Sequence, residues 1–303
     1  MAPPETQILN FSDEAIEKAA ELIRAGQPVA MPTETVYGLA ADATNAEAVA
    51  RIYAAKGRPS FNPLIVHVLD LDTAEHLGEF DDQARALANE HWPGPLTLVV
   101  PAREDNGIAS LVTAGLETIA IRVPAHPAMR ALLKAAGRPL AAPSANASGR
   151  ISPTRAAHVA DSLGGRIPLV IDGGPCEQGI ESTIVAATGG PLRLLRRGPI
   201  DIDAVEAVGA IEAPGMMASH YAPAKPIRLD AKVAEPGEIL LGYGPVAGEL
   251  YLGDNLVTAA ARLFDFMHEA DSAPEPRIAV APIPDEGIGA AINDRLRRAA
   301  APR

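Results

Sequence analysis

Two cationic and two hydrogen-bonding side chains are concentrated near the start of the sequence, where together they could bind a multiply charged anion. Lys56 falls on the apolar stripe of an expected helix, and Arg58 follows it after Gly57. Asn62 comes next, and His67 lies within an apolar run. Lysine and arginine side chains are common partners of phosphate oxygens. In the alternative interpretation, Lys56 complements the helix dipole, Arg58 is solvated and His67 is a satisfied core histidine.

Polar side chains also follow apolar runs elsewhere in the sequence. Ser144 and Asn146 come directly after residues 140–143, among small residues that let a ligand approach the backbone closely. Arg122 alternates with Ile121, so it lies on the opposite face of its expected strand. If that face borders a cavity, the guanidinium offers a bidentate fork for a carboxylate or phosphate. If the face borders solvent, which the sequence alone favours, Arg122 has no such role.

Other chemical groups give weaker or negative indications. Arg193, Arg196 and Arg197 form a dense basic group that suits phosphates or acidic neighbours. Ser144 lacks the G-x-S-x-G context of a hydrolase nucleophile, so binding is its expected role. The histidines are scattered without an HExxH motif, so the sequence predicts no metal site built by the protein. Mg²⁺ carried by a substrate is compatible with this prediction.

The composition is that of an acidic globular protein. Its 303 residues are 48% hydrophobic, enough for the cores of one large and one small domain. A net charge of −12 argues against a broad nucleic-acid surface, because such a surface needs clustered lysine and arginine. Cys176 is the only cysteine, which excludes an intramolecular disulfide. No secretory leader or membrane-length apolar run is visible, so we expect a cytoplasmic protein without membrane contact.

A strand, a polar turn, a helix, a basic loop and a second strand are expected to position the first group of side chains. The apolar runs 29–31 and 64–68 are the expected strands. Thr44 with Glu47 matches a capping box that starts the helix directly after the turn. Gly57 is placed to end this helix, so Lys56 and Arg58 lie close together at its C-terminus.

Further elements follow in an order typical of an α/β protein. The first expected helix begins after Ser12 and ends near Gly26, and residues 70–91 form one or two more. Further helices are expected at 128–136, after Ser152 as N-cap, and at 259–269. The last runs through Ile292 and Leu296. Expected strands occupy 96–100, 118–123, 140–143, 169–171, 182–187, 192–195, 237–243 and 277–281. The expected organisation is a large domain at 1–208, a proline-rich linker at 209–226 and a small domain at 227–303.

Three separated motifs occur in an order that is found in a known family. The turn and the residues after it read PTETVYGL, Lys56 and Arg58 match a KxR motif, and Ser144-Ala145-Asn146 matches SxN. Pro214-Gly215-Met216, followed by His220-Tyr221-Ala222-Pro223, resembles an interdomain linker. The chain therefore resembles the long form of the YrdC-like family of L-threonylcarbamoyladenylate synthases. The resemblance implies an α/β fold with a twisted mixed sheet, flanking helices and a concave central cavity, plus a small C-terminal Rossmann-like α/β domain.

The resemblance implies a nucleotidyltransferase. Similar proteins condense L-threonine, bicarbonate or CO₂, and ATP with Mg²⁺ into L-threonylcarbamoyl-AMP and pyrophosphate. This product leads to N6-threonylcarbamoyladenosine at position 37 of tRNA, so the expected partner is a downstream tRNA threonylcarbamoyl-transferase complex, with tRNA itself bound only weakly or indirectly. Negative charge accumulates around the phosphates during such a reaction, and cations stabilise it.

The resemblance also assigns roles to residues. Those expected to act in catalysis are Lys56, Arg58, Ser144 and Asn146. Those expected to bind ATP are Lys56, Arg58, Asn62, Thr118, Ser144, Ser152, Arg196 and Tyr221. Those expected to bind L-threonine are Thr35, His67, Arg122, Ala142 and Ser182, with Arg122 as the partner of the substrate carboxylate. Because the intermediates decompose in water, the linker with His220 and Tyr221 is expected to cover the cavity.

Two other functions stay open from the sequence. A concave basic sheet could bind RNA, although only 4% of the residues are aromatic and no RNA-stacking motif occurs. A transferase that uses a related carbamoyl-adenylate is the second, although larger proteins of that kind carry zinc-finger and acylphosphatase-like segments that are absent here. Threonine-dependent turnover of ATP distinguishes the synthase from both.

Overall fold

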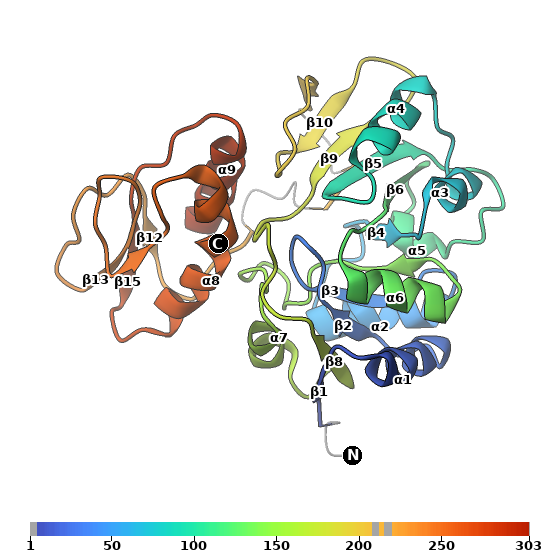
Figure 1. Ribbon diagram of the computed structural model, residues 1–303, viewed down its shortest axis with the longest axis horizontal. Helices are drawn as coiled ribbons and strands as arrows, with labels where there is room; N and C mark the ends of the chain where they lie inside the picture. The colour runs from blue at the N-terminus through green and yellow to red at the C-terminus, as the bar shows by residue number, and fades with distance from the viewer. Residues whose placement is uncertain (1–4, 208–211, 215–219, 303) are drawn as a thin grey trace.

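The computed structural model describes residues 5–207, 212–214 and 220–302, and these ranges contain two β-sheets with helices around them (Figure 1). The larger sheet has the strand order β1-β8-β2-β3-β7-β4-β6-β5-β9-β10-β11. Its strands are β1 (Gln7–Asn10), β2 (Val29–Met31), β3 (Gly38–Asp42), β4 (Ile65–His67), β5 (Leu96–Pro101), β6 (Thr118–Arg122), β7 (Leu140–Ala141), β8 (Leu169–Asp172), β9 (Thr183–Ala186), β10 (Arg193–Arg196) and β11 (Val205–Glu206). Strand β4 pairs parallel with β6 and antiparallel with β7, so the predicted mixed sheet is confirmed.

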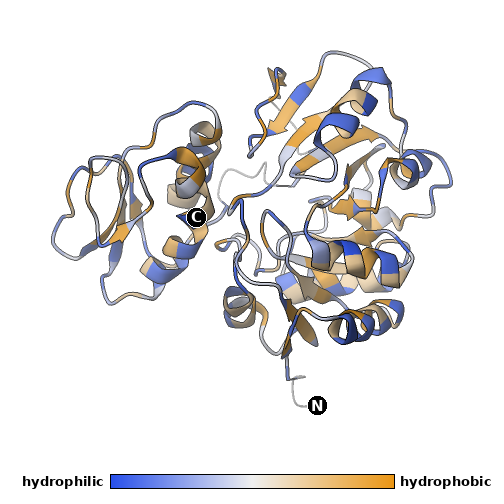
Figure 2. Cartoon of the chain, in the orientation of Figure 1, coloured by the Kyte–Doolittle hydropathy of each residue, from blue (hydrophilic) through white to orange (hydrophobic). Residues whose placement is uncertain are grey.

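Helices cover both faces of the part of this sheet that contains β2, β3 and β8. The helices around the large sheet are α1 (Asp13–Arg24), α2 (Ala46–Lys56), α3 (Leu71–Leu77), α4 (Asp82–His91), α5 (Ser110–Thr113), α6 (Pro127–Ala136) and α7 (Ala156–Leu163). Of these, α3 and α5 contact β6, and α4 contacts β5, in the other part of the sheet. Ala30 of β2 belongs to the core that includes α2, α3, α4, α5 and α7, whereas Val29 and Met31 pack with α1 and α6. Successive side chains of a strand point to opposite faces, which is why these neighbours enter different cores. The strands are accordingly apolar on both sides (Figure 2).

The other part of the sheet turns one face toward a small apolar cluster. This cluster includes Ile65 of β4, Ala120 of β6 and Ala213 from the segment after β11, and no helix in the described ranges contributes to it. His67 and Arg122 each follow one of these strand residues by two positions. They therefore lie on the same face of the sheet, which is free to form a binding site.

Helix α2 places Lys56 at the end of its buried face. It begins after Asn45, whose side chain accepts hydrogen bonds from two backbone N–H groups of the first turn. The predicted cap at Thr44 is wrong, because the Thr44 hydroxyl donates to Asp42 instead. The predicted end at Gly57 is confirmed, since Gly57 has the left-handed conformation (φ 60°) that glycine adopts without strain.

Two further expectations differ from the structure. The sequence predicts a helix directly after the polar turn, but Gly38–Asp42 first forms strand β3, antiparallel to β2. This strand is buried on both faces, so its small apolar residues show no alternation that would reveal it. Ser152 is predicted to cap a helix, but α7 begins at Ala156 because the Ser152 hydroxyl donates to Glu181.

A four-stranded parallel sheet and two helices form the C-terminal part of the chain. The strand order is β12-β15-β13-β14, with β12 (Ile227–Arg228), β13 (Glu238–Gly242), β14 (Leu250–Tyr251), β15 (Arg277–Val280), α8 (Leu256–Ser272) and α9 (Ile288–Ala300). Its core includes Tyr221 and also Val36 and Ile180 of the large part, so the two parts are packed together. Gly215 and Met216 of the linker motif lie outside the described residues. None of the helices in the described ranges combines the length and apolar character needed to cross a membrane.

Candidate functional site

A cavity lies on the uncovered face of the large sheet, where strand ends, the turn after β2 and part of the linker meet. It is lined by Thr33, Thr35, Val36, Gly38, Arg58, Ile65, His67, Arg122, Ala142, Pro143, Ser144, Glu181, Ser182, Arg196, Pro214, His220 and Tyr221. The lining contains three arginines and several hydroxyl groups. Such a cavity suits an anionic ligand that also needs hydrogen-bond donors.

His67 and Arg122 lie side by side on two parallel strands of this cavity. They are register partners of β4 and β6, and their exposed fractions are only 3% and 4%. The interpretation that the sequence alone favours, solvent exposure of Arg122, is wrong because that face of the strand borders the cavity. Burial, together with the Arg122 charge, lowers the pKa of His67 to about 3, so its imidazole is neutral at pH 7.

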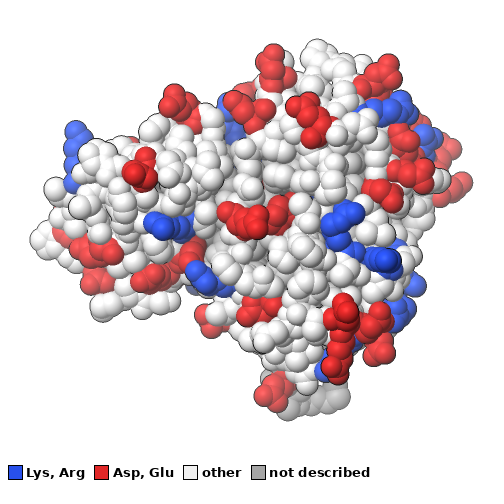
Figure 3. Space-filling view, in the orientation of Figure 1, with Lys and Arg blue, Asp and Glu red and all other residues white. Residues whose placement is uncertain are grey.

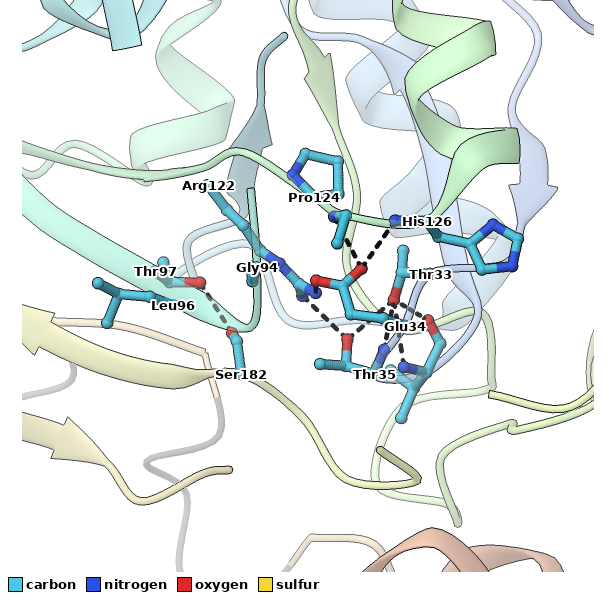
Figure 4. Close-up of polar contacts among 12 residues, drawn as sticks. Thr33, Glu34, Thr35, Gly94, Leu96, Thr97, Arg122, Pro124, His126 and Ser182 are labelled. Carbon is cyan, nitrogen blue, oxygen red and sulfur yellow. Dashed lines mark hydrogen bonds and ion pairs between the residues drawn. The ribbon is translucent and has the colours of Figure 1, made fainter. Parts of the chain in front are cut away.

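The Arg122 guanidinium is fixed by the turn that follows β2 (Figure 4). Its Nη2 donates to Glu34 Oε1 at 2.6 Å and its Nη1 donates to Thr35 Oγ1 at 2.9 Å. Glu34 Oε2 accepts from the backbone N–H groups of Ala125 and His126. Burial alone would raise the pKa of Glu34, but the Arg122 charge and these hydrogen bonds outweigh it and lower the pKa. Glu34 is therefore ionised at neutral pH and orients Arg122.

The turn itself is held by Thr33. Its hydroxyl donates to the carbonyl oxygen of Val36 at 2.6 Å and accepts from the backbone N–H groups of Thr35 and Val36. The Thr33 and Thr35 hydroxyl oxygens are also hydrogen-bonded to each other at 2.8 Å. Local hydrogen bonds of this kind are typical of threonine in tight turns. They place the Thr35 hydroxyl at the cavity.

Arg196 reaches the cavity from the end of β10. It donates from Nε to the carbonyl oxygen and from Nη2 to the hydroxyl of Ser182, both at 3.0 Å, and from Nη1 to the carbonyl of Pro214 at 3.3 Å. The Ser182 hydroxyl is also hydrogen-bonded to Thr97 at 2.8 Å (Figure 4). Burial lowers the pKa of Arg196, and this cation is partnered within the protein mainly by neutral groups. An anionic ligand would stabilise its charge.

Lys56 is buried beneath the turn that carries the SxN motif. Its Nζ donates to the backbone carbonyl oxygens of Ser144 and Asn146, each at 2.5 Å. Burial, with the neighbouring Arg58 charge, lowers the pKa of Lys56 well below its ordinary value. In this structure Lys56 therefore holds the turn that presents Ser144 to the cavity.

Arg58 lies in the cavity wall. Its Nε donates to the carbonyl oxygen of Asn62 at 3.2 Å and its Nη2 donates to that of Pro63 at 2.9 Å. Burial lowers the pKa of Arg58 to about 10, which leaves it protonated at neutral pH. A cation held by neutral carbonyl groups keeps its full attraction for a phosphate.

Several buried polar atoms in the cavity wall or directly behind it have no hydrogen-bond partner within the described ranges. They are His67 Nδ1, Asn146 Oδ1, His220 Nδ1 and Tyr221 Oη. Burying such atoms without a partner destabilises a protein by about 1–3 kcal/mol each. A polar ligand that binds in the cavity would provide partners, so these atoms mark the site as one built for binding.

The structure brings nine of the predicted residues together at the cavity: Thr35, Arg58, His67, Arg122, Ala142, Ser144, Ser182, Arg196 and Tyr221. Lys56, Asn62, Asn146 and Ser152 are buried but do not line it, and Thr118 lies at the opposite end of β6 from Arg122. Sequence reasoning missed the roles of Glu34 and Glu181. A lone carboxylate among the threonines of the PTET turn is the signal that could have revealed Glu34.

The described side chains do not form a binding site for a metal ion. Among these residues, no group of three or more His, Cys, Asp or Glu side chains is arranged to hold one. An ion at this cavity would need ligands from a substrate.

The fold and cavity define an α/β protein with a cavity on one face of a mixed sheet, lined by three arginines and suited to an anionic ligand. The family model described as "Telomere recombination" (Sua5/YciO/YrdC) matches residues 21–198, and the model described as "Threonylcarbamoyl-AMP synthase, C-terminal domain" matches residues 192–301. The chain belongs to this Sua5/YciO/YrdC family.

Individual relatives resemble the chain over nearly its whole length. The threonylcarbamoyl-AMP synthase of Bacillus subtilis is 41% identical over 98% of this chain and 96% of its own. That of Pyrococcus abyssi is 39% identical over 94% of this chain and 93% of its own. The crystal structure of P. abyssi Sua5 complexed with L-threonine superposes with a TM-score of 0.90 at 38% identity, covering 97% of this chain and 98% of that one. The predicted family and two-part architecture are confirmed.

Proposed function

We propose that this chain is an L-threonylcarbamoyladenylate synthase, a nucleotidyltransferase that converts L-threonine, bicarbonate or CO₂, and ATP to L-threonylcarbamoyl-AMP and pyrophosphate. The observation that carries the proposal is one cavity that combines an oriented Arg122 with the additional cations Arg58 and Arg196. The relatives named as threonylcarbamoyl-AMP synthases support it. The proposed organisation is a catalytic part at 1–208, a linker at 209–226 and a small domain at 227–303.

Arg122 is the proposed partner of the threonine carboxylate. Its guanidinium has five N–H donors, and among the described residues Gly94, Thr35 and Glu34 accept from three of them. Two N–H groups remain for the substrate. The hydroxyls of Thr35 and Ser182 and the neutral imidazole of His67 line the same cavity and are suited to the polar groups of threonine. The similar protein that is complexed with L-threonine supports this assignment.

The remaining cations suit the phosphates of ATP. The neutral threonine amine adds to the carbon of CO₂ and loses one N–H proton to solvent, which gives a carbamate anion. A carbamate oxygen then forms a bond to the α-phosphorus. The bond from that phosphorus to the bridging oxygen breaks, and pyrophosphate leaves with the electron pair. Arg58 and Arg196 would stabilise the charge that develops on the phosphate oxygens. No side chain becomes covalently modified, so catalysis depends on positioning and electrostatics.

The SxN turn is the proposed contact of the triphosphate. Ser144 presents its side chain at the cavity, while Lys56 and Asn146 lie directly behind it. Asn62, Thr118 and Ser152 stay proposed contacts of the nucleotide. Mg²⁺ would enter as the MgATP complex, with the phosphates as its main ligands.

The linker is the proposed cover of the cavity. Pro214, His220 and Tyr221 line the cavity from the linker side. A carbamate and a mixed anhydride both decompose in water, so excluding water preserves the intermediates. The product would then pass to a tRNA threonylcarbamoyl-transferase. On the face seen in Figure 3, basic and acidic side chains are both scattered among uncharged ones and form no continuous basic surface, which suits weak or indirect contact with tRNA.

Pyrophosphate release by the purified protein tests the proposal. The assay contains MgATP and bicarbonate, with or without L-threonine. Release that depends on both threonine and bicarbonate is expected. Independence from both in a folded sample would contradict the synthase, and salt-sensitive RNA binding without turnover would favour an RNA-binding module instead.

A further inference from the structure

One arginine of the small domain is buried against the cavity of the large one. Arg295 lies on α9 and has an exposed fraction of 0%. Its Nε donates to Glu181 Oε2 at 3.0 Å, and its Nη1 donates to the backbone carbonyl of Arg197 at 2.6 Å. These partners lie more than 90 positions earlier in the chain. Arg295 therefore joins α9 directly to the residues next to β9 and β10.

Glu181 transmits this contact to the site. It lines the cavity, and its second oxygen, Oε1, accepts a hydrogen bond from the Ser152 hydroxyl at 2.5 Å. Its neighbour in the chain is Ser182, whose carbonyl and hydroxyl accept from Arg196. The orientation of the Glu181 carboxylate thus affects two segments that face the cavity.

Arg295 also supports the linker. Its guanidinium carbon lies 5.5 Å from the centre of the Tyr221 ring, in a cation–π arrangement. Tyr221 has φ 62°, a left-handed conformation that a tyrosine adopts only when its surroundings hold it there. The Tyr221 ring also packs against the Phe264 ring of α8, with the two ring centres 5.6 Å apart. Small-domain side chains therefore fix the aromatic residue that lines the cavity.

The charge of Arg295 also sets the charge of Glu181. Burial alone would raise the pKa of Glu181, but the Arg295 and Arg196 guanidinium groups outweigh it and lower the pKa. Without Arg295, the buried Glu181 carboxylate would either take up a proton or draw Arg196 away from Ser182. Either change would alter the wall of the cavity.

We propose that Arg295 is a positioning residue of the synthase reaction, supplied by the small domain, which orients Glu181, Ser152 and Tyr221 around the bound nucleotide. This inference rests on the proposed function. It gives the small domain a direct part in the active site rather than the role of a separate appendage.

A second ion pair between the two parts provides a matched control. Arg155, next to α7, donates to both oxygens of Asp265 on α8 at 2.7 and 2.8 Å. This pair is a bidentate arginine–carboxylate contact, but Arg155 is 49% exposed and neither residue lines the cavity. Replacing Arg155 removes a contact between the parts without touching the site.

The experiment compares Arg295→Met, Arg295→Lys, Arg155→Met and the double variant Glu181→Gln/Arg295→Met with the wild type. Measured are kcat and KM for ATP and for threonine, and the rise in Tm that ATP causes. We expect Arg295→Met to lower kcat/KM for ATP by at least about tenfold and to reduce the ATP-induced rise in Tm, and Arg295→Lys to lie between. Arg155→Met should keep wild-type kinetics.

The double variant separates positioning from simple folding support. A glutamine at 181 is uncharged and still accepts from the Ser152 hydroxyl, so we expect it to restore kcat/KM by about fivefold or more over Arg295→Met. Equal kinetics of Arg295→Met and wild type, equal losses in Arg295→Met and Arg155→Met, or no restoration in the double variant would overturn the inference. The wild type could show no turnover but still a rise in Tm with ATP, and Arg295→Met could lose that rise. This result would refute the synthase reaction, while Arg295 would still be a positioning residue of the nucleotide site. The absence of both readouts from the wild type would overturn both proposals.

Discussion

The Arg122 guanidinium lies 2.6 Å from the Glu34 carboxylate, although only 5% and 7% of these two side chains are exposed. Glu34 comes from the turn after β2 and Arg122 from the end of β6, so the pair joins two segments that are remote in sequence. A buried pair of this kind contributes mainly by fixing geometry, because desolvation offsets much of its attraction. Its breakage leaves one buried charge without compensation.

We predict that Glu34→Gln destabilises the protein and weakens the threonine site. The amide no longer neutralises Arg122, so the free energy of unfolding should fall by about 3 kcal/mol. The KM for threonine should rise, since Arg122 loses the carboxylate that orients it. Urea unfolding and steady-state kinetics measure the two effects. Glu47→Gln, on the exposed side of α2, is the control and should change neither.

The sequence predicts most of the elements because their signals are local. Ser12 caps α1 as predicted, and Gly57 ends α2 in the expected left-handed conformation. Strand β3 is missed because burial on both faces removes alternation, and the expected cap at Ser152 is wrong because a remote carboxylate, Glu181, uses its hydroxyl. Local sequence patterns therefore fail to predict structure where a contact with a residue distant in the sequence determines it.

The same reason limits prediction of the site. The alternation of Arg122 with isoleucines correctly puts it on the other face of its strand, but only the assembled sheet shows that this face borders a cavity. The KxR motif alone points to Lys56, whereas its contacts with two carbonyl groups depend on the fold of residues 144–146. Arg295 carries no local signal, since its partner lies in the other domain.

Lys56→Ala should abolish threonine-dependent pyrophosphate release and also reduce stability. The sequence alone suggests that the fold would stay intact, but the structure shows that Lys56 Nζ donates to two backbone carbonyl oxygens. Leaving buried acceptors without a donor should lower the free energy of unfolding by about 2 kcal/mol. Thermal unfolding and the pyrophosphate assay measure both effects, with the exposed Lys18→Ala as control. Retained turnover would refute the placement of Lys56 behind the phosphate site.

His67 predicts how stability depends on pH. Burial lowers its pKa from 6.5 to about 3. Between pH 6.5 and 3, His67 therefore binds a proton in the unfolded chain but stays neutral in the folded protein. His67 therefore has no effect on stability well above pH 6.5 and destabilises the protein progressively as the pH falls below it. Between pH 6.5 and 4.5 this loss of stability amounts to about 2 kcal/mol.

His67→Gln should remove that part of the pH dependence. Unfolding free energies at pH 6.5, 5.5 and 4.5 should fall less steeply in the variant than in the wild type. His76→Gln is the matched control, because the folded protein leaves the His76 side chain exposed. Equal slopes for His67→Gln and the wild type would show that His67 takes up its proton without unfolding.

Tyr221 offers a test of the proposed cover that separates its hydroxyl from its ring. Its Oη has no hydrogen-bond partner within the described ranges, whereas its ring packs against His220, Phe264 and Arg295. Tyr221→Phe keeps this packing, so stability should be unchanged while the KM for ATP rises by about three- to tenfold through loss of one hydrogen bond. Tyr221→Ala removes the ring as well and should release more free intermediate or lower turnover. If both variants matched the wild type in kinetics and in leakage of the intermediate, Tyr221 would be a packing residue and the cavity would need no cover from the linker.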